Sequence, residues 1–337
     1  MALLVLGMFM APNVLASRGA PSAVTFTVNS TLDQPDDLTI PGTCHTSANT
    51  CTLRAAVMQA NRSSGAGATI LIPAGIYTLT IPIKGGDGEE NGDLNLTTPG
   101  SGNPVITITG AGASATTIDA NQLDRVFTVG YSRTAVISGV TISNGNISGA
   151  NAFGGGILNQ GFLTVSSATI SANHAISLGG GIDNIGILTV MNSTLHQNVS
   201  DFSGGAIQNS GSLNVLNSTL SQNTAVSGGG AITNTTNLKV NNSTIFGNTS
   251  YDGGGIYTES LNLYVINSTL SQNIANHNGG GIYKHGTGGL AALYNTSVIG
   301  NDADHDRDQT GGIGGGVYAE AVHALLWSTR CSPATPC

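Results

Sequence analysis

The hydrophobic and polar positions of this chain repeat at intervals of about 25 residues. Glycines followed by an apolar residue form a second series that keeps in phase with the first. Two series in phase indicate one structural unit copied about seven times. The first series, NSTL or NSTI, begins at Asn192, Asn217, Asn242 and Asn267, and the second places its apolar residue at Ile157, Ile182, Ile207, Ile232, Ile256, Ile282 and Val317.

Each unit contains three short apolar alternations separated by polar turns. In one unit the inward positions are Ile182, then Leu188 and Val190, then Ser193 and Leu195. Alternation with a period of two over so few residues is typical of strands, and none of these segments is long enough for a helix. The sequence therefore predicts an all-β fold. We expect a right-handed parallel β-helix with three-strand coils of about 25 residues, stacked ~4.8 Å apart.

Asparagines recur at two turn positions of the unit. We expect each series to form a ladder in which every side-chain amide bonds to the amides above and below it. Asparagine also tolerates the left-handed backbone that sharp corners require. The two series are Asn159, Asn184, Asn209 and Asn234, and Asn173, Asn198, Asn223, Asn248 and Asn273.

Residues 24 to 61 do not follow the 25-residue repeat. Leu53, Ala56, Val57 and Ala60 lie on one face of a short helix, and Thr52 is a candidate N-cap. A solenoid needs such a cap, because its open end would otherwise expose core side chains and unpaired strand edges.

The N-terminal end of the chain indicates secretion. An apolar run from Ala2 to Met10, followed by small residues, predicts a signal peptide over residues 1–20, with a buried N-terminal strand as the alternative. No later segment is apolar enough for a membrane helix, so we expect no membrane span after signal removal. The remaining chain divides into a capping module (21–65), the β-helix (66–329) and a cysteine-containing tail (330–337).

Four cysteines fall into two close pairs, Cys44 with Cys51 and Cys331 with Cys337. An even number of cysteines in a chain with a signal sequence favours disulfides. Metal binding is the alternative, but the chain has no CxxC motif to support it.

The small number of charged residues argues against nucleic acid and anionic lipid as partners. Only 8% of residues are charged, with 18 acidic and 10 basic side chains. Without a Lys/Arg patch to neutralise phosphates, we expect no nucleic-acid partner and no electrostatic docking on anionic lipid.

Three tyrosines are the first candidate for a binding site. Tyr257, Tyr283 and Tyr318 each follow the inward apolar residue of their coil, so we expect them to point outward and lie above one another. Such a stripe is suited to stacking on sugar rings or anchoring a partner protein. The alternative is a stack that only stabilises the last coils.

An acidic cluster is the second candidate. Asp302, Asp304, Asp306 and Asp308 alternate in DADHDRD and would offer oxygen ligands to calcium, the only cofactor that the sequence suggests. A solvated acidic loop is the alternative. The spacing departs from the EF-hand pattern, because Arg307 and Ile313 stand where that pattern has glycine and a bidentate acid.

The N-terminal third of the chain resembles a known module. CTLRAA, QAN, ILIPAGIYTLTI, GDLNLT, ITITGAGASATTIDA and DRVFTV are similar to the module named for its CSLREA motif, with Thr52 and Ala55 as departures. In bacterial secreted proteins that module precedes right-handed β-helix repeats of the pectin-lyase-like superfamily. The GGAI segments at Gly204–Ile207 and Gly229–Ile232 also resemble repeats of polymorphic outer-membrane proteins. These resemblances imply the fold strongly and the activity weakly.

The repeats carry few acids for chemistry. Asp183, Asp201, Asp252 and Glu259 are spread over several coils, and the Gly-His-Gly of pectin-degrading hydrolases is absent. We therefore assign no catalytic residue. The sequence predicts a secreted or cell-surface protein that acts as an adhesive or structural surface for polysaccharide or another surface molecule. The alternative is a polysaccharide lyase or glycoside hydrolase, which requires carboxylates that converge on one face.

Overall fold

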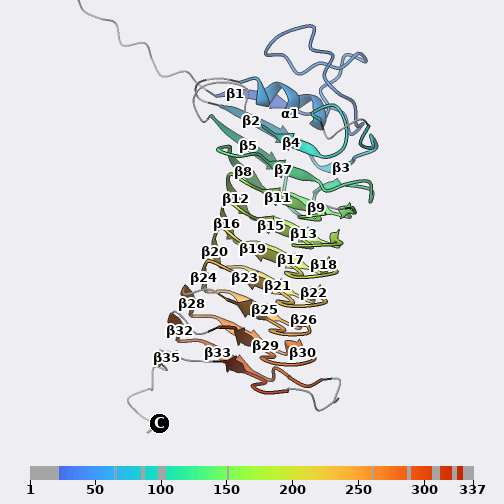
Figure 1. The fold of residues 1–337 in the computed structure, drawn as a ribbon. Helices are drawn as coiled ribbons and strands as arrows, with labels where there is room; N and C mark the ends of the chain where they lie inside the picture. Colours follow the sequence, from blue (N-terminus) through green and yellow to red (C-terminus); the bar gives the residue numbers. More distant parts are fainter. Residues whose placement is uncertain are drawn as a thin grey trace, which may run out of the picture.

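The protein is a column of stacked coils with one helix across its N-terminal end (Figure 1). The computed structural model describes residues 23–63, 65, 67–84, 88–97, 104–149, 152–259, 262–286, 290–305, 312–320 and 325–328. The predicted signal peptide, Asp306, Asp308, Cys331 and Cys337 lie outside the described residues. No helix in the described part is long and apolar enough to cross a membrane.

Three sheets run the length of the column, and every strand pairs in parallel with its neighbours in the coils above and below. Sheet A contains β1 (Val24–Thr27), β2 (Ala68–Ile72), β5 (Val105–Gly110), β8 (Thr134–Ser138), β12 (Phe162–Ser166), β16 (Ile187–Met191), β20 (Ser212–Leu216), β24 (Asn237–Asn241), β28 (Asn262–Ile266), β32 (Leu290–Tyr294) and β35 (Leu325–Ser328). Sheet B contains β3 (Gly75–Thr78), β6 (Thr116–Asp119), β9 (Thr141–Ser143), β13 (Thr169–Ser171), β17 (Thr194–His196), β21 (Thr219–Ser221), β25 (Thr244–Phe246), β29 (Thr269–Ser271) and β33 (Ser297–Ile299). Sheet C contains β4 (Leu94–Leu96), β7 (Phe127–Val129), β11 (Ile157–Asn159), β15 (Ile182–Asn184), β19 (Ile207–Asn209), β23 (Ile232–Asn234), β27 (Ile256–Thr258), β31 (Ile282–Lys284) and β34 (Val317–Ala319).

The predicted all-β solenoid is confirmed, and the structure adds a fourth, narrow sheet. Sheet D turns the chain from sheet B toward sheet C, and its inward residues are small, such as Ala175 and Ser200, both fully buried. Each strand of sheet D has only two residues, and the inward one is small. Such a strand shows no apolar alternation, so the sequence did not predict this sheet. Its strands are β10 (Asn146–Ile147), β14 (His174–Ala175), β18 (Val199–Ser200), β22 (Thr224–Ala225), β26 (Thr249–Ser250) and β30 (Ile274–Ala275).

The core is a set of stacked aliphatic rows. Ile182, Ile207 and Ile232 pair in register in sheet C, and all three are fully buried. Leu188 and Val190 of sheet A and Leu195 of sheet B face them and are also buried. Every coil thus buries the same kind of side chain at the same place, which is why the sequence repeats.

Some connections between the sheets keep the same length in successive coils, and others do not. From β8 onward, two residues join each strand of sheet A to the next strand of sheet B, and from β9 onward two residues join sheet B to sheet D. The connections that enter and leave sheet C have six and two residues in the three coils from β14 to β24 but differ in length outside them, as the long link from Ile147 to Ile157 and the link from Lys284 to Leu290 illustrate.

Both predicted asparagine series lie in fully buried rows. In the first row, Asn159 donates to Asn184, Asn184 to Asn209 and Asn209 to Asn234, each over 2.6 Å. Asn234 then donates to the Thr258 hydroxyl over 3.1 Å, and the next position in the row is Lys284. The second row runs from Asn173 to Asn273 over 2.9 Å steps and continues to Asn301, whose spacing of 28 residues falls outside the regular repeat.

The N-terminal end is closed by helix α1 (Leu53–Asn61), all of whose residues are buried. Thr52 is its N-cap and accepts a hydrogen bond from the Ala55 amide over 3.1 Å. Arg54 binds Asp33 through two nitrogens, at 2.6 and 3.1 Å, and donates to the Gly92 carbonyl. This pair is buried on both sides and ties the helix to the loop before it.

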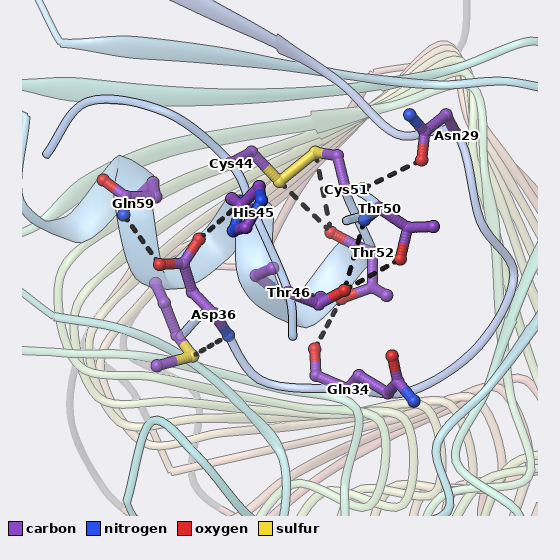
Figure 2. Close-up of a disulfide and its surroundings, with 12 residues drawn as sticks. Asn29, Gln34, Asp36, Cys44, His45, Thr46, Thr50, Cys51, Thr52 and Gln59 are labelled. Atoms are coloured by element: carbon purple, nitrogen blue, oxygen red, sulfur yellow. Dashed lines mark hydrogen bonds between the residues drawn. A yellow bond between two sulfur atoms is a disulfide. The ribbon is translucent and has the colours of Figure 1, made fainter. Parts of the chain in front are cut away.

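A disulfide joins Cys44 to Cys51, with a Cα–Cα distance of 5.1 Å, as the sequence predicted. Figure 2 shows it beside the start of α1, where Asp36 accepts hydrogen bonds from the His45 amide and from the Gln59 side chain, both over 2.8 Å. The loop over residues 33–51 is therefore held to the helix by covalent and polar contacts together.

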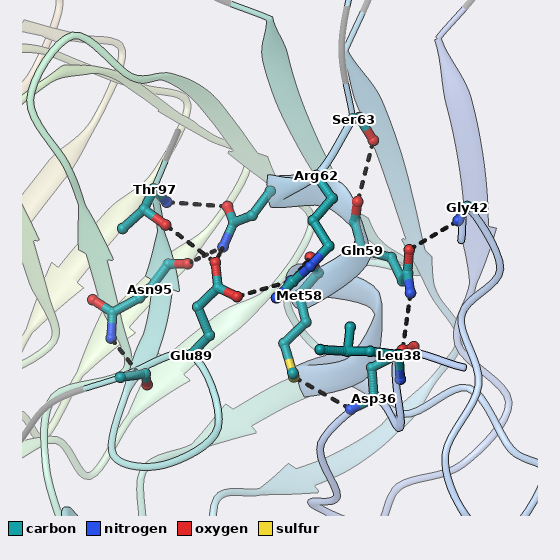
Figure 3. Close-up of polar contacts among 12 residues, drawn as sticks. Asp36, Leu38, Gly42, Met58, Gln59, Arg62, Ser63, Glu89, Asn95 and Thr97 are labelled. Carbon is teal, nitrogen blue, oxygen red and sulfur yellow. Dashed lines mark hydrogen bonds and ion pairs between the residues drawn. The ribbon is translucent and has the colours of Figure 1, made fainter. Parts of the chain in front are cut away.

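The far end of α1 is held by a second set of polar contacts (Figure 3). Arg62 lies 2.8 Å from Glu89, and Glu89 also accepts from Asn61 over 2.9 Å. Asn61 further donates to the Asn95 carbonyl in sheet C. These contacts join the helix directly to the first coil.

Candidate functional site

The outer face of sheet C carries a row of side chains that differ in every coil. Strand pairing places the middle residues of β11, β15, β19, β23, β27, β31 and β34 directly above one another. They form the floor of what we call the sheet C groove. In order along the column they are Leu158, Asp183, Gln208, Thr233, Tyr257, Tyr283 and Tyr318.

Two walls flank this floor. One wall follows the connection from sheet D, where Phe153, Leu178, Ser203, Gly228 and Asp252 pair in parallel as isolated bridges. The other follows the connection to sheet A and includes Gln160, Ile185, Thr235 and Glu259, which line the two hollows described below. These are the two connections whose length differs between coils, so the groove lies where the coils vary.

The three tyrosines of the predicted stripe share this floor. Tyr257 and Tyr283 are 5.3 Å apart between ring centroids in an edge-to-face arrangement, and Tyr283 and Tyr318 are stacked at 5.4 Å with 13° between their planes. Tyr283 is only 5% exposed because its neighbours cover it, whereas Tyr257 and Tyr318 are half-buried. Of the three, Tyr257 faces the open part of the groove.

Carboxylates hold the tyrosine hydroxyls. Tyr257 donates to Glu259 over 3.2 Å, and Tyr283 donates to Glu320. Burial raises the pKa of Tyr257 and of Tyr283 above the ordinary range for tyrosine, and the adjacent carboxylates raise both pKa values further. Glu320 also accepts from the Gly286 amide and lies 3.0 Å from His285, and the tyrosine hydrogen bond is the main reason why its pKa is lowered.

A hollow of about 370 Å³ opens in the groove beside Tyr257. Its floor is Gln208, Thr233 and Tyr257, and its rim includes Phe202, Asp252 and Glu259. Phe202 is 55% exposed, so its ring is available to a ligand. Gln208 is 4% exposed, and its side-chain oxygen has no hydrogen-bond partner among the described residues. A buried acceptor without a partner is costly unless a bound group donates to it.

Asp252 is oriented by its neighbours. Its Oδ1 accepts from the Asn278 amide and lies 2.9 Å from His277 Nδ1. The His277 ring stacks on Tyr251 with the centroids 5.0 Å apart. Asp252 is thus fixed at the rim by contacts that join two successive coils.

A second hollow of about 600 Å³ lies toward the N-terminal end of the same groove. Its lining includes Tyr131, Phe153, Leu158 and Ile185, with Gln160 as a polar group. Tyr131 is 69% exposed and stands at the edge. The two hollows give the groove an aromatic side chain near each end.

The acids named from the sequence do not gather at one point. Asp183 is 3% exposed in the floor, and burial raises its pKa to about 7 although Arg125 opposes the shift. Asp201 lies 3.0 Å from His174 outside the hollow beside Tyr257. Only Asp252 and Glu259 line that hollow together, and no lysine or arginine lies among the described residues that line it.

The expected calcium loop is described only in part. Asp302 lies 2.9 Å from His305, and Asp304 donates its backbone N–H to the His277 carbonyl. Asp306 and Asp308 are outside the described residues. Within the described part of the chain, no three side chains of the His, Cys, Asp and Glu types gather as metal ligands would.

Sequence reasoning found the tyrosines but missed what surrounds them. Phe202, Gln208 and Thr233 occupy the same face through the repeat, and the floor position after Ile182 was visible as the outward position of the strand. The repeat register could have predicted the floor residues of the groove. Every residue one place after an inward Ile belongs to the same row.

Comparison with known proteins leaves the fold as the main guide to function. No protein-family model matches the chain. No curated protein matches it either.

Proposed function

We propose that this protein is a secreted or cell-surface carbohydrate-binding protein, and that neutral sugar rings bind in the sheet C groove beside Tyr257. The single observation that carries the proposal is the hollow that Tyr257, Phe202 and Gln208 line together. Aromatic rings stack on the apolar faces of sugars, and side-chain amides exchange hydrogen bonds with hydroxyl groups.

The charges of the site favour a neutral ligand over an acidic one. Asp252 and Glu259 stand at the rim of the hollow, and the whole chain carries a net charge of -8. A polyuronate would place further carboxylates beside these acids, and like charges at short range are unfavourable. Neutral hydroxyl groups would instead donate hydrogen bonds to the two carboxylates.

The family relationship belongs to the same proposal. The helix α1 module resembles the CSLREA type, and the coils resemble those of the pectin-lyase-like superfamily. The parallel solenoid is compatible with both. Secretion is supported by the apolar N-terminal run and by the Cys44–Cys51 disulfide, since disulfides persist in oxidising compartments.

Glycan-array binding by the full chain tests the proposal. We expect retention of neutral glycans, and a loss of roughly tenfold or more in affinity on Tyr257→Ala, the size of effect that a central aromatic contact has. Tyr264→Ala is the matched control, because Tyr264 is a half-buried tyrosine in β28 of sheet A, away from the groove. Retention that Tyr257→Ala leaves unchanged would place the binding elsewhere.

One observation favours a second candidate function. Asp252 and Glu259 line the same hollow, and a pair of carboxylates is what glycoside hydrolysis uses. Product analysis on each retained glycan separates the two functions. New reducing ends that disappear in both Asp252→Asn and Glu259→Gln would establish hydrolysis, and retention without cleavage would establish a binding protein.

A further inference from the structure

Arg133 occupies a corner of the column where the next three coils have Gly161, Gly186 and Gly211. It directly precedes β8, and Phe162 pairs with Thr134, so Gly161 lies opposite Arg133 in the next coil. A Cβ atom on Gly161 would lie 2.3 Å from the Arg133 carbonyl oxygen. The following coil therefore has no room for the arginine side chain at this corner.

The guanidinium of Arg133 is bound toward the preceding coil. Its Nη1 donates to the Pro104 carbonyl over 3.1 Å, and Pro104 lies opposite Arg133 in the register of β5 and β8. The side chain is among the largest of the fully buried ones, with 0% exposure. This arginine is thus enclosed between two coils.

Two of its nitrogens lack a partner. Nε and Nη2 are buried without a hydrogen-bond acceptor among the described residues. These two nitrogens form one edge of the planar guanidinium, where two N–H bonds run side by side, and this edge is the one that binds anions in a bidentate manner. The two unpaired N–H groups therefore point in the same direction, toward one possible acceptor.

The other buried arginines in the described part of the chain, Arg54 and Arg125, each have a carboxylate partner. Arg54 binds Asp33 through two nitrogens, and Arg125 lies 3.3 Å from Asp93. For Arg133, burial lowers the pKa, and no acidic side chain among the described residues counteracts the shift. A buried cation without a countercharge is strongly unfavourable, and arginine keeps its proton in proteins.

We propose that Arg133 binds a small inorganic anion, of the size of chloride, through Nε–H and Nη2–H at the corner between β5 and β8. The full burial of the side chain excludes a polymer or a large organic acid. The anion would supply the charge that Asp33 supplies to Arg54.

Thermal unfolding of the full chain tests the site. Sodium chloride is exchanged for sodium gluconate at constant ionic strength, because gluconate is too large for the corner. We expect the Tm to rise by roughly 2–4 °C for each tenfold increase in chloride above its dissociation constant. Arg133→Met should abolish this rise. Arg62→Met should keep it, because Arg62 is an exposed arginine paired with Glu89.

A second measurement covers the case in which Arg133→Met does not fold. The ³⁵Cl NMR line of chloride should broaden in the presence of the wild-type chain, and sulfate should narrow it again if an oxyanion competes for the same donors. The proposal is overturned if chloride changes neither the wild-type Tm nor its own ³⁵Cl line width, or if Arg133→Met and Arg62→Met respond alike.

Discussion

Asn184 donates a 2.6 Å hydrogen bond from its side-chain nitrogen to the side-chain oxygen of Asn209, and both side chains are fully buried. Asn209 in turn donates to Asn234. Asn184 and Asn209 are each donor and acceptor at once, beside the aliphatic rows of the core. Because a buried polar group is tolerated only when it is paired, the row depends on every member.

Replacing Asn209 by alanine should lower the free energy of unfolding by about 2–4 kcal/mol, because Asn184 loses its acceptor and Asn234 loses its donor. Urea unfolding followed by circular dichroism measures the change. Asn214→Ala is the control, since Asn214 is half-buried on the outer face of β20, and it should change stability by less than about 0.5 kcal/mol. Equal losses for the two variants would show that the buried row contributes no more than a surface amide.

The buried ion pair of the cap should be far more important than the exposed one. Arg54→Gln leaves the Asp33 carboxylate buried without its cation, so we expect a loss of about 3–5 kcal/mol. Arg62→Gln removes a pair that is 39% exposed on the arginine side and should cost about 0–1 kcal/mol. Both variants are measured by the same urea unfolding. A small effect of Arg54→Gln would mean that water reaches Asp33.

Asp183 should make stability depend on pH. Its pKa is about 7 in the folded protein against an ordinary 3.8, so the folded state holds the proton more tightly than the unfolded state does. The free energy of unfolding should therefore fall as pH rises from about 4 to 7. The total fall from this group is at most about 4 kcal/mol.

Asp183→Asn tests this dependence, because asparagine does not ionise. The variant should be more stable than the wild type at pH 7.5 and should lose most of the slope between pH 4 and 7. Denaturant unfolding at three pH values measures it. A variant whose slope equals that of the wild type would assign the pH dependence to other groups.

Tyr257 and Tyr283 should resist ionisation more strongly than an ordinary tyrosine does. Burial and adjacent carboxylates raise the pKa of both, so both should remain protonated at pH 11. Absorbance at the tyrosinate band reports the number of tyrosines ionised. Tyr257→Phe should therefore leave the absorbance change between pH 7 and pH 11 unaltered. A smaller absorbance change in this variant would contradict the burial of Tyr257.

The sequence predicted the parts of the fold that rest on local alternation and failed where the partner is distant. Leu188, Val190 and Leu195 revealed sheets A and B because period-two alternation is a property of the segment itself. Asn301 extends the second asparagine row, yet its 28-residue spacing hid it from a 25-residue search. The Arg54–Asp33 pair left no signal, because nothing in the local sequence states which carboxylate a buried arginine will meet.

The candidate site was predictable only in its aromatic part. Tyr257, Tyr283 and Tyr318 share a position in the repeat, so their row follows from the spacing. Asp252 and Glu259 come from connections on opposite sides of β27, and their meeting at one hollow depends on how those connections fold. Asp252 and Glu259 stand in links of five and three residues, whereas the coils before them have six and two, and neither acid recurs in the repeat, so the acids appeared scattered in the sequence.

The two-residue corners have a consequence for how this molecule can change. An added residue between β20 and β21 would rotate one coil against all the others, since Asn217 and Ser218 must stay in line with their counterparts above and below. An added residue beside sheet C would alter only a wall of the sheet C groove. The links that follow β27 and β31 are already longer than two residues and lie at that wall. The core and its two-residue corners therefore tolerate little change in length, whereas the links that border sheet C tolerate insertions. New binding loops can arise there in one coil at a time while the core stays the same.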